Sequence, residues 1–126
     1  MHTAGSPGAT PSSRAAAGQG GLMGLYDRMF GESIAHGTIF RRAIEEDLIN
    51  PHKMVQIGQR TTGYSADDFE WVRQQGVRVV NAEECWYQSL TPLMAEVREQ
   101  IGAETQAYVS FDIDGIDPAS APGTGT

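Results

Sequence analysis

The sequence predicts an α/β fold whose strands form a mostly parallel sheet. Short apolar runs typical of buried strands alternate with longer segments that carry apolar residues at helical spacing. In chain order these are a helix at 38–48, a strand at 54–58, a helix at 65–75, a strand at 77–80, a helix at 91–101 and a strand at 108–112. Because a helix between two strands returns the chain to the same edge of the sheet, this order indicates parallel strands with helices packed on them. Ligands of such sheets bind beyond the carboxyl ends of the strands.

Residues 1–26 are predicted to be a disordered segment that precedes the domain at 27–126. They are rich in Ala, Gly, Ser, Thr and Pro, they contain no acidic residue, and Arg14 is their only Lys or Arg. A composition this poor in large apolar residues cannot bury enough surface to order itself. An acid-free N-terminus is also typical of a mitochondrial transit peptide, but one arginine is few for that function. We therefore expect a cytoplasmic protein and keep mitochondrial import as the alternative.

The first two helices are predicted from the residues at their ends. Thr38 is a favourable N-cap, and Asn50-Pro51 ends the helix that follows it. Ser65-Ala66-Asp67-Asp68 has the form of a capping box, which opens the second helix. Gly76 is the residue type that commonly follows the last turn of a helix.

The third helix begins at Thr91-Pro92, an N-cap followed by proline at the first helical position. One apolar face then runs along the helix, through Leu93, Met94, Val97 and Ile101. Between the helices, residues 54–58 and 77–80 are short, nearly continuous apolar runs, as expected of strands buried on both faces.

The last strand leads into a segment that carries two carboxylates. Side chains two apart on a strand point to the same face, so Asp112 and Asp114 are expected to lie together, roughly 6–7 Å apart along the strand. Two like charges at that distance favour a bound cation, and oxygen ligands suit Mg, Ca and Mn. Taken alone, an Asp-x-Asp pair before a turn is more often a solvated turn than a metal site.

A longer string around these aspartates is much more specific, and it reads Ser110-Phe111-Asp112-Ile113-Asp114-Gly115-Ile116-Asp117-Pro118, followed by Ala121-Pro122-Gly123-Thr124-Gly125-Thr126. It resembles the signature of the ureohydrolases, the arginase and agmatinase family, and is most similar to the agmatinase branch. The resemblance implies a three-layer α/β/α sandwich, the arginase-like fold, of which this chain holds an incomplete part. It also implies that Asp112 and Asp114 ligate a binuclear Mn²⁺ centre, while Asp117-Pro118 fixes the turn.

The same resemblance extends upstream and assigns three further site residues. Gly31-Glu32 and His36-Gly37 are similar to a family segment whose histidine is a proton shuttle to the leaving amine, which makes His36 the candidate catalytic residue. A histidine suits that task because its pKa lies near neutrality. Arg60 lies in a loop that borders the substrate in the family, although an ordinary connecting loop is an equal alternative. Thr126 is similar to a threonine close to the guanidinium group.

The family's upstream metal-binding run, Asp-Ala-His-x-Asp, is not matched. Its ligand positions fall on Gly20, Leu22 and Gly24, none of which can ligate a metal through a side chain. We therefore expect the chain, taken as a truncated copy, to be inactive by itself.

The function that the resemblance implies is hydrolysis of agmatine to putrescine and urea by a manganese enzyme. Guanidinobutyrate, or another substrate of a related amidinohydrolase, is the alternative. The substrate would be a small cationic guanidino compound, and the complete protein is expected to be a homo-oligomer. A small acidic module that binds one Ca²⁺ at Asp112 and Asp114 is the least favoured alternative, because calcium takes about 6–8 oxygen ligands.

Charge and hydropathy exclude other classes of partner. The net charge of −7 disfavours a surface for nucleic acid or anionic membranes. No apolar run approaches the length of a membrane span. The single cysteine, Cys85, excludes an intrachain disulfide framework and a Cys-based zinc cluster, and a packing role is favoured for it.

Overall fold

The computed structural model describes residues 15–19, 24–60, 66–117 and 119–123. The strands are β1 (Ala15–Gln19), β2 (Met54–Gln59), β3 (Arg78–Asn81) and β4 (Ala107–Val109). The α-helices are α1 (Ile39–Glu45), α2 (Ala66–Gln74), α3 (Ala82–Cys85) and α4 (Thr91–Ile101), and short 3₁₀ helices are η1 (Pro51–Lys53) and η2 (Ile113–Gly115). The six predicted helices and strands are therefore confirmed, and β1 and α3 are elements that were not predicted.

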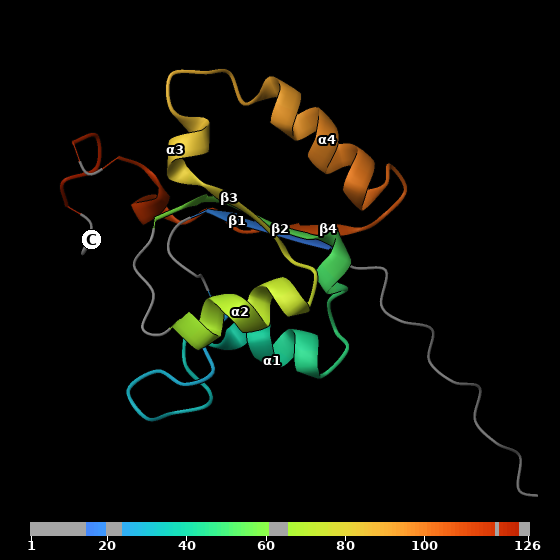
Figure 1. Cartoon of the computed structure of the whole chain (residues 1–126), viewed down its shortest axis with the longest axis vertical. Coiled ribbons are helices and arrows are strands. Elements are labelled where there is room, and N and C mark those ends of the chain that lie inside the picture. The colour runs from blue at the N-terminus through green and yellow to red at the C-terminus, as the bar shows by residue number, and fades with distance from the viewer. Residues whose placement is uncertain (1–14, 20–23, 61–65, 118, 124–126) are drawn as a thin grey trace, which may run out of the picture.

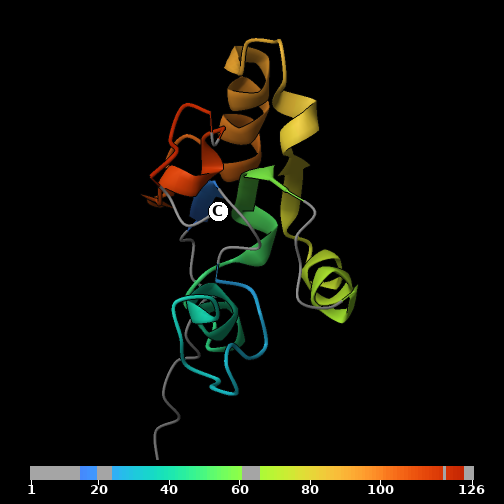
Figure 2. The same ribbon diagram turned by 90° about the vertical axis from the view of Figure 1, so that its left-hand side faces the viewer.

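The strands form one parallel sheet in the order β3-β2-β1-β4. Figure 1 shows α1 and α2 on one face of this sheet and α3 and α4 on the other, and Figure 2 shows the same layers from the side. This arrangement is the three-layer α/β/α sandwich that the sequence predicts. No helix in the described part of the chain has the length and apolar character needed to cross a membrane.

β1 corrects the prediction that residues 1–26 are disordered. Residues 15–19 form a central strand, with Ala16 opposite Met54 of β2 and Tyr108 of β4. A central strand is stabilised by backbone hydrogen bonds to the strands on both sides. Small residues can therefore form such a strand, and the composition of the segment does not predict it. Leu25 and Tyr26 are also buried, in contrast to the prediction. The rest of that segment, 1–14 and 20–23, lies outside the described residues.

Two apolar cores hold the layers together because successive side chains of a strand point to opposite faces. On the face covered by α1 and α2, Met54 packs in a buried cluster, whose other members are Leu25, Tyr26, Phe40, Ile44, Val72 and Val77. On the opposite face, Val55 and Ile57 of β2 pack with Val80 of β3 and Val97 of α4.

The predicted helix ends are confirmed in part, since α1 ends at Glu45 rather than at residue 48, and Thr91, the expected N-cap, is the first residue of α4 with Leu90 as its N-cap. Gly76 and Gly102 follow α2 and α4 with φ of +81° and +89°, the left-handed conformation that glycine adopts at low cost. Thr38 precedes α1, but its buried hydroxyl bonds within the preceding turn, accepting from the Ala35 N–H and donating to the Ser33 carbonyl, both at 2.9 Å. Ser65, the expected cap of α2, lies outside the described residues.

Candidate functional site

The carboxyl ends of β2 and β4 meet at one edge of the sheet, on the left in Figure 1 and facing the viewer in Figure 2. The Nη2 atom of Arg60, directly after β2, donates to the Ile116 carbonyl at 2.7 Å. A Cβ atom on Gly58 would lie 3.9 Å from the Gly115 carbonyl oxygen, so the two glycines are neighbours. The edge therefore has the position expected of a ligand site in a parallel sheet.

The prediction that Asp112 and Asp114 share one face of a strand is wrong. β4 ends at Val109, where its pairing with β1 ends, and residues 113–115 form the 3₁₀ helix η2. The Gly115 N–H bonds to the Asp112 carbonyl at 3.1 Å and the Ile116 N–H to the Ile113 carbonyl at 3.2 Å. Because these backbone groups are satisfied within the turn, the strand does not continue through them. Both aspartates instead belong to one tight turn, which we call the acidic turn (residues 112–116).

Asp112 is half-buried in the acidic turn, and the side chain of Asp114 lies outside what the structure describes. Asp117, just beyond the turn, has the turn-fixing role that was expected of it. Its Oδ1 accepts from the Ala119 N–H at 2.8 Å, and its carbonyl accepts from the Ser120 N–H at 2.8 Å. Asp117 is thus an Asx-turn residue.

His36 is exposed in the loop at 24–38, which belongs to the helical layer of α1 and α2 in both ribbon views. A hydrogen bond from the Tyr26 N–H to the Gly37 carbonyl at 3.0 Å joins the two ends of the loop. No hydrogen bond between described residues joins His36 to the acidic turn. The structure therefore brings Arg60 to the turn that contains Asp112 and Asp114, and no hydrogen bond between described residues does the same for His36. Thr126 lies outside the described residues.

The donors present fit Mn²⁺ by type, and they amount to part of a site. Carboxylate oxygens are ligands that suit Mn²⁺, and the turn at this edge of the sheet contains two aspartates, Asp112 and Asp114. Within the described ranges, no group of three or more His, Cys, Asp or Glu side chains is placed to hold a metal. At Gly24, where the family run would place a ligand, φ is +72° and a Cβ would lie 2.7 Å from Cδ2 of Phe40. A ligating side chain at 24 is therefore incompatible with the observed packing.

Gln56 and Gln59, two buried glutamines of β2, are residues of this edge that sequence reasoning missed. Gln59 is 1% exposed, and its Nε2 donates to Oε1 of Gln56 at 3.2 Å. The signal that could have found them is Gly58, because a glycine inside a strand often marks a β-bulge.

Cys85 lies at the end of α3, where Glu84 accepts the Asn81 N–H at 2.9 Å. Burial, and then the adjacent Glu84 carboxylate, raise the pKa of the Cys85 thiol. A raised pKa disfavours the reactive thiolate at neutral pH, which agrees with the packing role expected of this residue.

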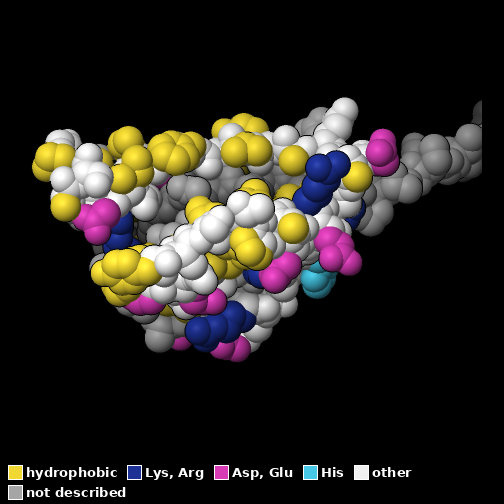
Figure 3. Space-filling model, turned by 90° about the horizontal axis from the view of Figure 1, so that it is seen from above, with side chains coloured by type: hydrophobic (Ala, Val, Ile, Leu, Met, Phe, Trp, Pro, Cys, Tyr) yellow, Lys and Arg dark blue, Asp and Glu magenta, His cyan; other side chains and the backbone are white. Residues whose placement is uncertain are grey.

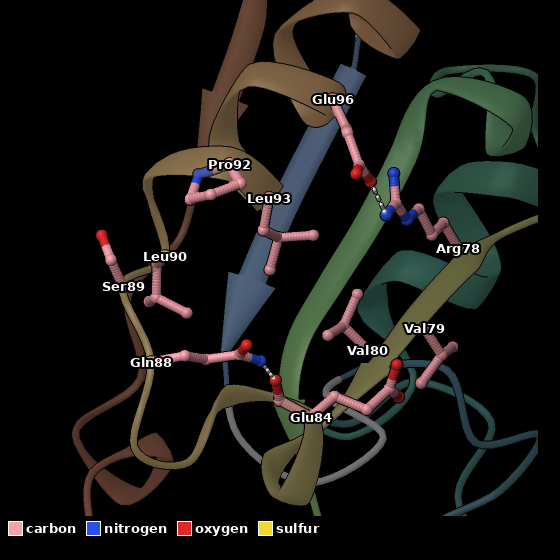
Figure 4. A pocket seen from close by; sticks show the side chains of 10 residues that line it. All are labelled: Arg78, Val79, Val80, Glu84, Gln88, Ser89, Leu90, Pro92, Leu93 and Glu96. Carbon is pink, nitrogen blue, oxygen red and sulfur yellow. Dashed lines mark hydrogen bonds and ion pairs between the residues drawn. The ribbon is translucent and has the colours of Figure 1, made fainter.

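Two hollows lie away from the acidic turn. One has a volume of about 490 Å³ and is lined by β3 and by the chain from α3 to α4. Figure 4 shows the Arg78–Glu96 ion pair (2.6 Å) at one end and Gln88 bonded to the Glu84 carbonyl at the other. The other hollow, of about 450 Å³, lies by α2, where Arg41 stacks 4.2 Å from the ring centroid of Trp71. Neither hollow is lined by a predicted site residue.

The fold of this chain is similar to that of two solved structures. The chain superposes on the proclavaminate amidino hydrolase of Streptomyces clavuligerus with a TM-score of 0.75 and 39% identity, over 92% of this chain and 38% of that one. It superposes on a formiminoglutamase of Trypanosoma cruzi with a TM-score of 0.74, over 89% of this chain and 37% of that one, where 17% identity shows the fold alone. The fold is therefore the arginase fold, present in part.

The family follows from the sequence match. Residues 24–126 match the model of the Arginase family, and the chain belongs to that family. It is 67% identical over 102 residues to a guanidinobutyrase of Pseudomonas aeruginosa, covering 81% of this chain and 32% of that protein. It is 54% identical over 100 residues to a mitochondrial agmatinase of Gallus gallus, covering 79% of this chain and 29% of that protein. The chain thus spans about a third of the length of these relatives.

Proposed function

We propose that the protein to which these residues belong hydrolyses the guanidino group of a small molecule and requires manganese. One observation carries the proposal. The Asp112 and Asp114 segment forms a turn at the carboxyl edge of the parallel sheet, where Arg60, the residue after β2, donates to its backbone at 2.7 Å. Its motif is the one that resembles the ureohydrolases, and the chain belongs to the family that contains them.

Each site residue has a task that its chemistry suits. Asp112 and Asp114 would supply carboxylate oxygens to the metal, whose contribution when bound is to lower the pKa of a water to near neutrality. Arg60 keeps the turn in place through the Ile116 carbonyl. His36, exposed in its loop, would accept or donate a proton at an imidazole nitrogen. Thr126 is proposed to contact the guanidinium.

Two substrates are proposed, and they differ at the end remote from the guanidino group. Agmatine ends in an ammonium group and guanidinobutyrate in a carboxylate, so one enzyme should prefer one of them. The terminal motif favours agmatine, while the 67% identity to a guanidinobutyrase favours guanidinobutyrate. Both should be offered at equal concentration, and the ratio of kcat/KM decides between them.

The test is release of urea with Mn²⁺ by the longest expressed form of the protein. Asp112→Ala should reduce kcat at least about a hundredfold, because it removes a ligand of the metal site. Asp67→Ala changes an exposed carboxylate on α2 and serves as the matched control that keeps activity. Equal activity of the parent protein and Asp112→Ala would refute the assignment.

The second candidate is that the chain of 126 residues has no activity by itself. The observation that favours it is that its described residues include no group of three or more metal-ligating side chains. Under this proposal the purified chain of 126 residues releases no urea with either substrate and Mn²⁺. Mn²⁺-dependent urea release by that chain would exclude it.

Assembly and location are proposed as well. We propose a homo-oligomer in the cytoplasm, with mitochondria as the alternative, because vertebrate relatives have "mitochondrial" in their names. Fractionation of cells that express the tagged protein would distinguish the two compartments.

A further inference from the structure

Gln59, one of two buried glutamines of β2, carries a polar atom whose burial stability does not explain. Gln56 is 0% exposed and Gln59 is 1% exposed, although burial of an amide is costly unless all of its polar groups are bonded. Oε1 of Gln59 is buried and has no hydrogen-bond partner among the residues that the structure describes. A buried acceptor without a partner typically costs about 1–3 kcal/mol. A residue retained at that cost suggests a task other than stability.

The hydrogen bond between Gln56 and Gln59 exists because β2 contains a bulge. Residues three apart on a regular strand point to opposite faces, so these side chains could not otherwise meet. The register against β3 shifts by one residue between Ile57 and Gln59, and Gly58 at the shift has φ of +82°. The extra residue turns Gln59 onto the face of Gln56, and the amide bond at 3.2 Å then bridges the bulge.

The bulge is followed directly by Arg60, which is bonded to the acidic turn. Arg60 donates from Nη2 to the Ile116 carbonyl at 2.7 Å, and Gly58 lies beside Gly115. The direction in which the chain leaves β2 therefore determines whether Arg60 reaches Ile116.

We propose that Gln59 is a positioning residue for the acidic turn. The hydrogen bond from Gln59 to Gln56 stabilises the bulge, and the bulge orients Arg60. Arg60 in turn holds the backbone of the turn that contains Asp112 and Asp114. The value of this arrangement for metal binding rests on the proposed function. The link from Gln59 to the acidic turn does not depend on the proposed function, so the positioning role and the metal site can be tested separately.

The test is amide hydrogen exchange of the 126-residue chain at Gly115 and Ile116, whose N–H groups are bonded inside the turn. Gln59→Met keeps the size and burial of the side chain and removes the amide. We expect exchange at these two amides to become about fivefold faster, the change produced by losing roughly 1 kcal/mol of net hydrogen-bond energy. Exchange in the centre of α4, which follows the stability of the whole chain, should stay unchanged. Gln59→Met loses a hydrogen bond but also removes an unsatisfied acceptor, and these two effects on the free energy of unfolding offset each other.

Gln74→Met is the matched control, since it makes the same chemical change at an exposed amide on α2. It should leave exchange at Gly115 and Ile116 as in the parent chain. If Gln59→Met leaves them unchanged, or accelerates exchange equally throughout the chain, Gln59 is a packing residue and the proposal is wrong.

A second variant keeps the proposal testable if Gln59→Met does not fold. Gly58→Ala places a side chain on a residue with φ of +82°, while the nearest atom to the new Cβ is the Gly115 oxygen at 3.9 Å, an ordinary contact. It strains the bulge without a steric clash, and it should produce the same local acceleration at Gly115 and Ile116. Unchanged exchange in Gly58→Ala would also overturn the proposal.

A Mn²⁺ titration of the longest expressed form, with the metal alone as probe, separates this inference from the proposed function. If both hold, Gln59→Met weakens Mn²⁺ binding by about the same fivefold factor. Faster exchange at the turn without Mn²⁺ binding by the parent protein would support the positioning role and contradict the metal site.

Discussion

Arg60 contacts the backbone of a turn 56 residues further along the chain. The family resemblance implied a loop that borders the substrate, with an ordinary connecting loop as an equal alternative, and the structure shows its guanidinium bonded to the Ile116 carbonyl. A guanidinium has several donors in a fixed planar arrangement, so one side chain can hold a turn and still present further N–H groups. A role in substrate binding stays a prediction, and the role in holding the turn is the one its geometry supports.

Asp27 gives a pH-dependent prediction at the same scale. Its Oδ1 accepts from Nη2 of Arg42 at 2.9 Å and lies 3.4 Å from Arg41. The hydrogen bond from Arg42, and then the charges of the arginines, lower the pKa of Asp27 below its usual 3.8. Because the folded pKa is the lower one, the stabilisation is present above the unfolded pKa and is lost as the pH falls through the folded value.

We therefore expect Asp27→Asn to reduce the free energy of unfolding at pH 7 by no more than about 1 kcal/mol, since the carboxylate is largely exposed. The difference from the parent chain should shrink below pH 3.8. Urea denaturation at several pH values measures it, with Asp67→Asn as the control. A difference that persists unchanged in acid would contradict this account.

Among the secondary-structure elements, the position where a strand ends or bulges depends on the strands beside it. β4 ends at Val109 because its ladder with β1 ends there, and the Asp-x-Asp segment then folds into η2. The bulge in β2 likewise lies where its register against β3 shifts. The helices, by comparison, end close to residues that the sequence marks, such as Gly76 after α2 and Gly102 after α4.

Gly76 and Gly31 provide a matched pair of variants that tests one such helix end. Both have positive φ, +81° and +85°, so alanine is strained at either position. A Cβ on Gly76 would lie 2.4 Å from Nδ1 of His52, whereas a Cβ on Gly31 would have no neighbour within 4 Å. We expect Gly31→Ala to cost about 1 kcal/mol from the left-handed backbone, and Gly76→Ala to cost at least about 1 kcal/mol more from overpacking.

The difference should appear as a lower midpoint of chemical denaturation for Gly76→Ala, with an unchanged m-value. Equal midpoints for the two variants would show that His52 moves aside freely and that the helix end is not closely packed there.

At the scale of the whole molecule, β4 is the edge of the described sheet on its side, and the surface around it is apolar. Tyr108 and Val109 of β4 are 60% and 74% exposed, and Phe111 and Ile113 beyond it are also exposed. Figure 3 shows apolar side chains along one rim of the molecule. An exposed strand edge with apolar side chains favours pairing with another strand.

We expect the chain of 126 residues to self-associate as its concentration rises, measured by sedimentation velocity. Val109→Lys should weaken association by about tenfold or more, because burying one valine contributes roughly 1.5–3 kcal/mol. Leu48→Lys replaces another exposed apolar residue, one that is not part of β4, and should leave association unchanged. Equal weakening by both variants would show that association does not depend on this edge.

From the amino-acid sequence, six of the helices and strands, the apolar residues of the cores and the family motif around Asp112 and Asp114 could be predicted. These features are encoded by residues close together in the chain, through apolar spacing, caps and turn residues. The folded chain was needed to show that residues 15–19 form a central strand, that β4 ends before the aspartates, and that Arg60 holds the turn containing them. Each of these depends on hydrogen bonds between distant segments, because a backbone group pairs with whichever strand or turn lies beside it. A local pattern can therefore identify the acidic turn, but only the assembled sheet shows what holds it in place.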